Sequence, residues 1–200
     1  VIFPNWETLL INGMKRLRSI WNNPQAPNSF CNLNKVEING CNSLHHVFPI
    51  VVAKELRQLQ VLEISKSNIE NIVQESDTKD VKSFCLEKLI VYKCDRLKSI
   101  LPSSVLCKTS TSLRILYISS CHKLEQIFAN KNEGYAPVEI AFTKLEELIL
   151  ADLPWLTIFC KGIYNFNFPS LLTIHVIRFP TMKTFLDHGN LTTIGQHKWR

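Results

Sequence analysis

Residues 86–100 read LEKLIVYKCDRLKSI, and this stretch decides the fold. Its apolar residues follow the pattern Leu-x-x-Leu-x-Val-x-x-Cys-x-x-Leu-x-x-Ile. The part from Leu89 to Val91 predicts a short strand with both of these side chains facing inward, because neighbouring residues of a strand point to opposite faces. Leu97 and Ile100 then fill the core from the other side. We therefore expect this unit to consist of one strand, one turn and a segment that returns across the core.

This unit recurs along the whole chain. Residues 113–127 read LRILYISSCHKLEQI and residues 33–47 read LNKVEINGCNSLHHV. The strand position shared by all copies is occupied by Leu9, Val36, Leu62, Leu89, Leu116, Leu148 and Ile174. Successive positions are 26 or 27 residues apart, except for one step of 32. Because one unit cannot cover its own apolar face, this period predicts a solenoid of stacked units.

The period is typical of leucine-rich repeats. The predicted fold class is α/β: a horseshoe-shaped solenoid with a parallel sheet on its concave face and irregular loops with short 3-10 or α turns on its convex face. Residues 1–186 should form about seven units of about 27 residues, with an insertion near 129–140 that explains the long step. Residues 187–200 are polar and should form a C-terminal flank. The chain starts without Met, so we expect a fragment of a longer protein.

Three local motifs carry a resemblance to a family. They are Phe168-Pro169-Ser170-Leu171, residues 118–124 (ISSCHKL) and residues 97–102 (LKSILP). Over residues 1–186 the chain resembles the leucine-rich repeats of plant intracellular disease-resistance proteins of the coiled-coil nucleotide-binding kind. The resemblance implies a cytoplasmic module that recognises a pathogen effector or a host protein and restrains the nucleotide-binding switch. No Gly-x-x-x-x-Gly-Lys-Ser/Thr motif is present, so we expect no cofactor in this segment. ADP or ATP is implied only for an upstream domain.

Strand residues that alternate with the core should project onto the concave face and bind a protein partner. An exposed apolar patch that contains Tyr suits such an interaction surface. The candidate partner-binding residues are Lys35, Glu37, Glu63, Lys88, Ile90, Tyr92, Ile115, Tyr117, Glu147, Ile149, His175 and Ile177. A preference of strands for β-branched residues would give the same pattern without a partner, and an adjacent domain could equally cover it.

Cys41, Ser67, Cys94 and Cys121 occupy one position in successive units. Leucine-rich repeats place Asn or Cys there, so we interpret these residues as a structural ladder in the turn. Cys41 and Cys94 are two units apart, roughly 10 Å at the spacing of stacked strands, which disfavours a shared zinc ion. The seven cysteines form no Cys-x-x-Cys pair, which favours a reducing compartment.

The net charge of +6 comes from Lys and Arg that are scattered in the sequence among acidic residues. This favours a modest preference for acidic partners over nucleic-acid binding. We expect no membrane span and no enzyme, because no long apolar run and no hydrolase motif appear. We expect Trp155, Phe159, Phe166 and Phe168 to stay exposed in the last units. Two other functions remain open: an extracellular receptor ectodomain, and the substrate-receptor repeats of an F-box ubiquitin ligase.

Overall fold

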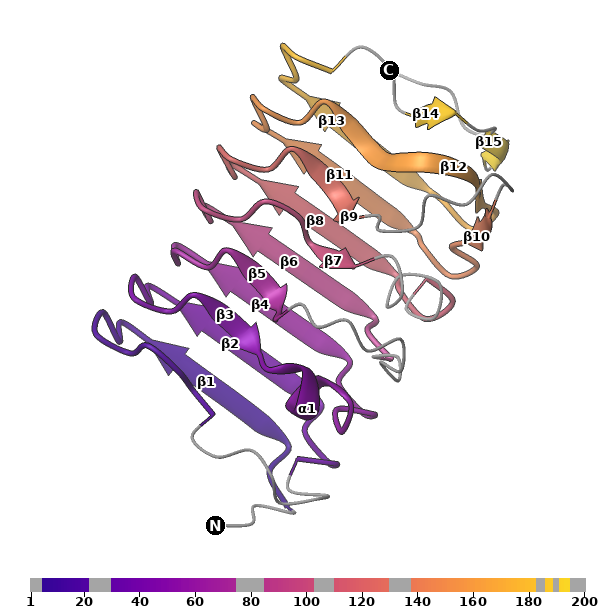
Figure 1. The fold of residues 1–200 in the computed structure, drawn as a ribbon. Helices are drawn as coiled ribbons and strands as arrows, with labels where there is room; N and C mark the ends of the chain where they lie inside the picture. The colour runs from indigo at the N-terminus through magenta and orange to yellow at the C-terminus, as the bar shows by residue number, and fades with distance from the viewer. Residues whose placement is uncertain are drawn as a thin grey trace.

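The computed structural model describes residues 5–21, 30–74, 85–102, 110–129, 138–182, 186–188 and 191–194. These residues form a parallel β-solenoid with almost no helix (Figure 1). The centre of the predicted insertion, residues 130–137, lies outside the described residues, as does most of the predicted flank. The insertion and the domain boundaries therefore stay predictions.

Seven strands form one parallel sheet, in the order β1-β2-β4-β6-β8-β11-β13. Their bounds are Thr8–Asn12 for β1, Lys35–Asn39 for β2, Val61–Ser65 for β4, Lys88–Tyr92 for β6, Ile115–Ser119 for β8, Glu147–Ala151 for β11 and Thr173–Ile177 for β13. The seven predicted strand positions lie directly opposite one another, from Leu9 beside Val36 to Leu148 beside Ile174. The prediction of a parallel sheet with one strand per unit is confirmed, and the step of 32 residues does not disturb its register.

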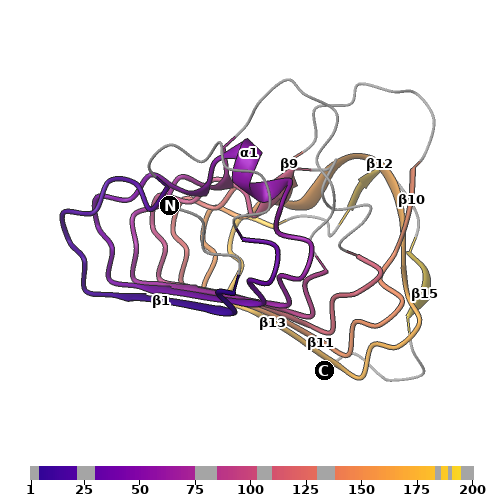
Figure 2. The same ribbon diagram turned by 90° about the horizontal axis from the view of Figure 1, so that it is seen from below.

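A second layer lies across the core from this sheet (Figure 2). It contains β3 (His46–Phe48), α1 (Ile50–Ala53), β5 (Asn71–Val73), β7 (Leu101–Pro102), β9 (Gln126–Ala129), β10 (Val138–Ala141), β12 (Ile158–Phe168), β14 (Leu186–His188) and β15 (Leu191–Ile194). β3 pairs with β5, β7 with β9, and β12 with β9, β10, β14 and β15.

The strands of the second layer differ from the predicted irregular loops with helical turns. Among the described residues α1 is the one helix, so the α/β class is matched only in part. The physical reason is the repeat itself. An apolar pair such as Val47-Phe48 or Ile127-Phe128 stands at the same place in its unit, and the constant period stacks these pairs on one another. Extended backbone at the same place in successive units forms parallel hydrogen bonds. The horseshoe curvature stays a prediction.

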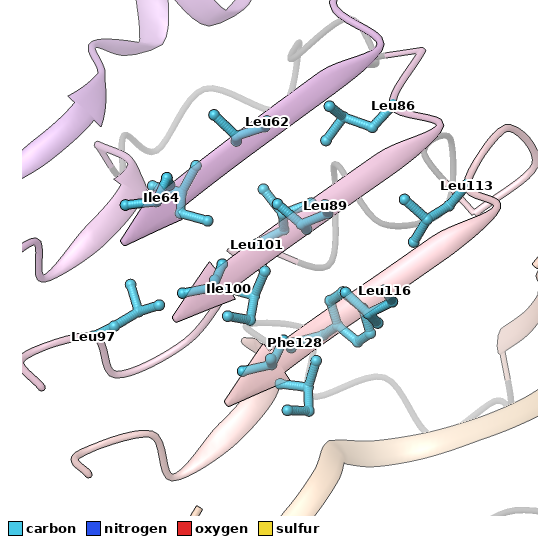
Figure 3. Packing of buried hydrophobic residues seen from close by; sticks show 14 of the residues in the cluster. Leu62, Ile64, Leu86, Leu89, Leu97, Ile100, Leu101, Leu113, Leu116 and Phe128 are labelled. Atoms are coloured by element: carbon cyan, nitrogen blue, oxygen red, sulfur yellow. The ribbon is translucent and has the colours of Figure 1, made fainter. Parts of the chain in front are cut away.

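Inward side chains of both layers form one continuous core (Figure 3). Leu62, Leu89 and Leu116 from three adjacent strands are 0% exposed. Leu97 and Phe128 meet them from the returning part of the unit. Each central unit is therefore covered by the units before and after it, as the sequence pattern requires.

Aromatic rings fill the core of the C-terminal units. Phe159, Phe166 and Phe168 are at most 2% exposed, and the ring centroids of Phe159 and Phe166 are 5.4 Å apart. The prediction that these three residues stay exposed is wrong, because β12 turns from β9 to β10 and folds its aromatic residues over the core. Trp155 is 64% exposed, as expected.

Each of the seven strands is followed directly by a residue with positive φ. These residues are Gly13, Gly40, Lys66, Lys93, Ser120, Asp152 and Arg178. The left-handed conformation turns the chain out of the sheet, and it is readily accessible only to glycine. Five turns adopt it with other residues, so the conformation is imposed by the stacking of the turns.

Candidate protein-binding surface

The seven-stranded sheet turns one face away from the second layer (Figure 2). We call this the outer sheet face; it consists of the first, third and fifth residues of each strand. The burial pattern of the central strands alternates, with these residues partly exposed and the second and fourth residues buried. All twelve predicted partner-binding residues lie on this face. The pleat of the strands thus brings together residues that are up to 142 positions apart in the sequence.

The middle of the outer sheet face is apolar. Ile90 lies beside Tyr117, and Tyr117 lies beside Ile149, on the adjacent strands β6, β8 and β11. Ile115 and Tyr92 extend this group, which we call the central apolar patch. All five side chains are partly exposed. An apolar surface of neighbouring residues that includes two tyrosines is suited to contact with another protein.

Charged residues lie on the N-terminal side of the central apolar patch and pair with one another. Lys35 Nζ is 2.5 Å from Glu37 Oε1, and Lys88 Nζ is 2.8 Å from Glu63 Oε1. The hydrogen bond with Glu37 raises the pKa of Lys35, so this side chain stays protonated. Because these charges cancel in pairs, this part of the face carries little net charge to a partner.

The C-terminal part of the outer sheet face is more open than its centre. Glu147, His175 and Ile177 are exposed, and Ile177 retains 44% of its accessible surface. Glu147 lies between Ile115 and Thr173 in the register of the sheet. The predicted residues therefore form one surface with three parts: paired charges, an apolar centre and an open end with both polar and apolar residues.

The predicted ladder residues lie in the turns after the strands. Cys41, Ser67, Cys94 and Cys121 are at most 1% exposed. The hydroxyl of Ser67 donates to the Ser65 carbonyl and accepts from the Cys41 backbone N–H. Every one of these side chains contacts backbone groups of its own or the neighbouring turn. Such bonds satisfy polar groups that a buried turn would otherwise leave unpaired.

The thiols of Cys94 and Cys121 are neighbours in this ladder. Their contact and the burial of the site raise the pKa of the Cys121 thiol far above its ordinary value. Cys121 therefore stays a neutral thiol, and its Sγ lies 3.4 Å from the Ser119 carbonyl that accepts from it. Neutral thiols are poor metal ligands and poor nucleophiles. Within the described part of the chain, no three His, Cys, Asp or Glu side chains gather into a possible metal site.

The comparison with protein families agrees with the repeat. The family model for the leucine-rich repeats of plant disease resistance proteins resembling RPS2 matches residues 1–68 and 64–188. The chain belongs to this family. The resemblance drawn from the sequence motifs is thereby confirmed at the level of the family. The chain matches no curated protein sequence and no solved structure.

Family membership defines the general role of the solenoid. Leucine-rich repeats of plant disease resistance proteins are recognition modules in defence, and repeats of this kind are typically non-catalytic. None of the helices that the structure describes is long and apolar enough to cross a membrane. The outer sheet face is therefore the first surface to consider for recognition.

Proposed function

We propose that the chain is the protein-recognition module of a cytoplasmic plant immune receptor and binds its partner through the outer sheet face. The central apolar patch carries this proposal, because its five side chains are partly exposed although they are Ile and Tyr. Tyrosine contributes large contact area and a hydroxyl at a small cost in conformational entropy. The membership in a disease resistance family supports the assignment to defence.

The partner is a pathogen effector or a host protein, and the same repeats restrain an upstream nucleotide-binding switch. ADP or ATP would bind that upstream domain and not these repeats. The predicted partner-binding residues Lys35, Glu37, Glu63, Lys88, Glu147, His175 and Ile177 surround the central apolar patch. The charged groups of this set and the His175 ring would orient the partner, since a polar rim around an apolar centre is the usual layout of protein interfaces. The family match favours this function over a receptor ectodomain or an F-box protein.

The test replaces two residues of the central apolar patch, Ile90→Ser and Tyr117→Ser together, in the receptor expressed in plant tissue. Contacts at the centre of an interface carry most of its binding free energy, so we expect partner affinity to fall by about tenfold or more. The measurement is the defence response to the triggering pathogen together with co-precipitation of the recognised protein.

A matched control is Val51→Ser, which removes an exposed apolar residue of α1 that is 45% exposed and lies outside the sheet. This variant should respond like the wild type. Equal accumulation of all three proteins is checked by immunoblot. An unchanged response of the patch variant at wild-type protein level would refute the role of the outer sheet face.

A further inference from the structure

The turns that follow the seven strands form a continuous row along one edge of the solenoid (Figure 1). We call this row the turn ridge; it consists of residues 13–18, 40–45, 66–70, 93–98, 120–125 and 152–157 and of Arg178. At the start of every turn from Gly13 to Asp152, the residue with positive φ donates its backbone N–H to the last carbonyl of the next strand. The donor–acceptor distances of this ladder are 2.8 Å for Gly13 to Asn39, 3.0 Å for Gly40 to Ser65, 2.9 Å for Lys66 to Tyr92, 3.0 Å for Lys93 to Ser119, 3.0 Å for Ser120 to Ala151 and 2.9 Å for Asp152 to Ile177.

A second backbone ladder fixes the other end of the turns. Glu70 donates to the carbonyl of His45 at 2.8 Å, and Lys98 donates to that of Glu70 at 3.4 Å. Glu125 donates to Lys98 at 3.3 Å, and Thr157 donates to Glu125 at 3.1 Å. Because both ends of the turns from residues 40–45 to 152–157 are bonded to neighbouring turns, the side chains of this part of the turn ridge project from a fixed frame. Binding to such a frame costs little ordering of the backbone.

The turn ridge accounts for most of the net positive charge of the chain. It holds nine Lys and Arg residues and four Asp and Glu residues, a net charge of +5 out of the total of +6. The cations are Lys15, Arg16, Arg18, Lys66, Lys93, Arg96, Lys98, Lys123 and Arg178, and all of them are exposed. The opposite edge consists of the segments that lead into the strands. Their described residues hold four cations and four anions, so this edge is neutral: Lys54, Arg57, Arg114 and Lys144 against Glu7, Glu55, Glu87 and Glu146. The solenoid is therefore electrostatically polarised from one edge to the other.

Most acidic residues of the turn ridge already have partners. Asp95 Oδ1 lies 2.7 Å from His122 Nδ1, and Glu70 lies 3.6 Å from the His45 ring and 4.0 Å from Arg96. Asp152 pairs with Arg178. The cations without an ion pair to another described residue are Lys15, Arg16, Arg18, Lys66, Lys93, Lys98 and Lys123. Lys93 Nζ lies 5.1 Å from the centre of the Tyr92 ring, and the ammonium and guanidinium groups of all seven keep donors available to carboxylates from outside.

We propose that the turn ridge binds an acidic segment of a partner protein. This binding is additional to recognition by the outer sheet face and uses different side chains. A nucleic acid fits the turn ridge less well, because Glu70, Asp95 and Glu125 recur along it and would repel a continuous line of phosphates. An acidic polypeptide carries its carboxylates at intervals, so it can place them beside the cations of the turn ridge and away from these three acidic residues.

The test measures binding of a fluorescein-labelled poly-L-glutamate peptide to the full chain by fluorescence anisotropy at low and at physiological salt. The ridge variant carries Lys66→Glu, Lys93→Glu and Lys98→Glu. The matched control carries the same change of charge on the opposite edge, as Lys54→Glu, Arg57→Glu and Lys144→Glu. If the turn ridge is the site, at physiological salt the ridge variant loses about tenfold or more in affinity and the control loses about threefold or less, because exposed charges beyond a Debye length are screened.

Three results would overturn the proposal. One is an equal loss in both variants, which would assign the binding to net charge alone. Another is tighter binding of a single-stranded oligonucleotide with the same number of charges, which would assign the turn ridge to nucleic acid. The third is the absence of peptide binding to the wild type at low salt.

Two further variants keep the result interpretable. Replacement of the same three ridge lysines by Gln removes the charge with less repulsion, and it is used if the Glu variant fails to unfold cooperatively. The patch variant Ile90→Ser with Tyr117→Ser should bind the acidic peptide like the wild type. Loss of peptide binding in the patch variant would contradict a separate ridge site, whereas failure of the proposed sheet-face function leaves peptide binding unchanged.

Discussion

The central strand β6 and the last strand of the sheet, β13, have the same pattern of residues but bury it to different extents. Leu89 and Val91 of β6 are 0% exposed, whereas Val176 at the equivalent inward position of β13 is 40% exposed. β6 pairs with β4 and β8, while β13 pairs only with β11 among the described strands. Burial in this fold is therefore decided by the presence of two neighbours and not by the sequence of the unit alone.

The largest expected difference between the two regions concerns their inward residues. Leu89→Ala should lower the free energy of unfolding by about 2–5 kcal/mol, because it removes a fully buried side chain from a core that cannot collapse around the cavity. Ile174→Ala at the equivalent position of β13 should cost about half as much or less, since Ile174 is only partly buried. Urea unfolding of the two variants measures both values, and equal losses would show that a further part of the molecule covers β13.

The inward positions illustrate what the sequence determines. Leu9, Val36, Leu62, Leu89, Leu116, Leu148 and Ile174 could be aligned from the repeat alone, and they lie opposite one another in the sheet. The alternation of side chains along each strand then placed the twelve candidate residues on the same face. Their role in binding is a proposal, because no pattern in the sequence identifies a partner.

Other features depend on the assembled solenoid. The strands β7 and β9 are two and four residues long, and such short segments carry no periodic signal of their own. The burial of Phe166 depends on the corner in β12, where the pairing of this strand changes from β9 to β10. The +5 charge of the turn ridge was also missed, since its residues look scattered until the repeat stacks them. The recurrence of Lys66 and Lys93 directly after their strands was the available signal.

The turns provide a smaller test of the same comparison between a unit and its neighbours. Lys66 has φ 48 and Gly40, one turn earlier, has φ 68. Lys66→Gly should raise the free energy of unfolding by about 0.5–1 kcal/mol, because glycine adopts this conformation without the steric cost of a Cβ atom. Thermal unfolding measures the change.

Gly40→Ala is the reverse experiment and should lower the free energy of unfolding by about 1 kcal/mol. The nearest atoms to an added Cβ are backbone atoms of Gly13 at 3.6 Å, so strain in φ and not a collision is the cause. A lower free energy of unfolding in Lys66→Gly would mean that contacts of the lysine side chain stabilise the turn by more than the left-handed conformation of Lys66 destabilises it.

The smallest expected effect belongs to the ion pair between the last two turns. Hydrogen bonds from Arg178 hold the pKa of Asp152 below its ordinary value of 3.8. A carboxylate whose pKa is lowered by folding stabilises the folded state at pH values above its unfolded pKa, and this contribution disappears as pH falls through the folded pKa.

In Arg178→Gln the Asp152 pKa, followed by NMR, should rise toward 3.8, whereas Arg57→Gln should leave it unchanged. The stability difference between Arg178→Gln and the wild type should accordingly be present at neutral pH and shrink below pH 3.8. A difference that persists in acid would indicate that Arg178 acts through packing on the exposed end of the solenoid and not through its charge.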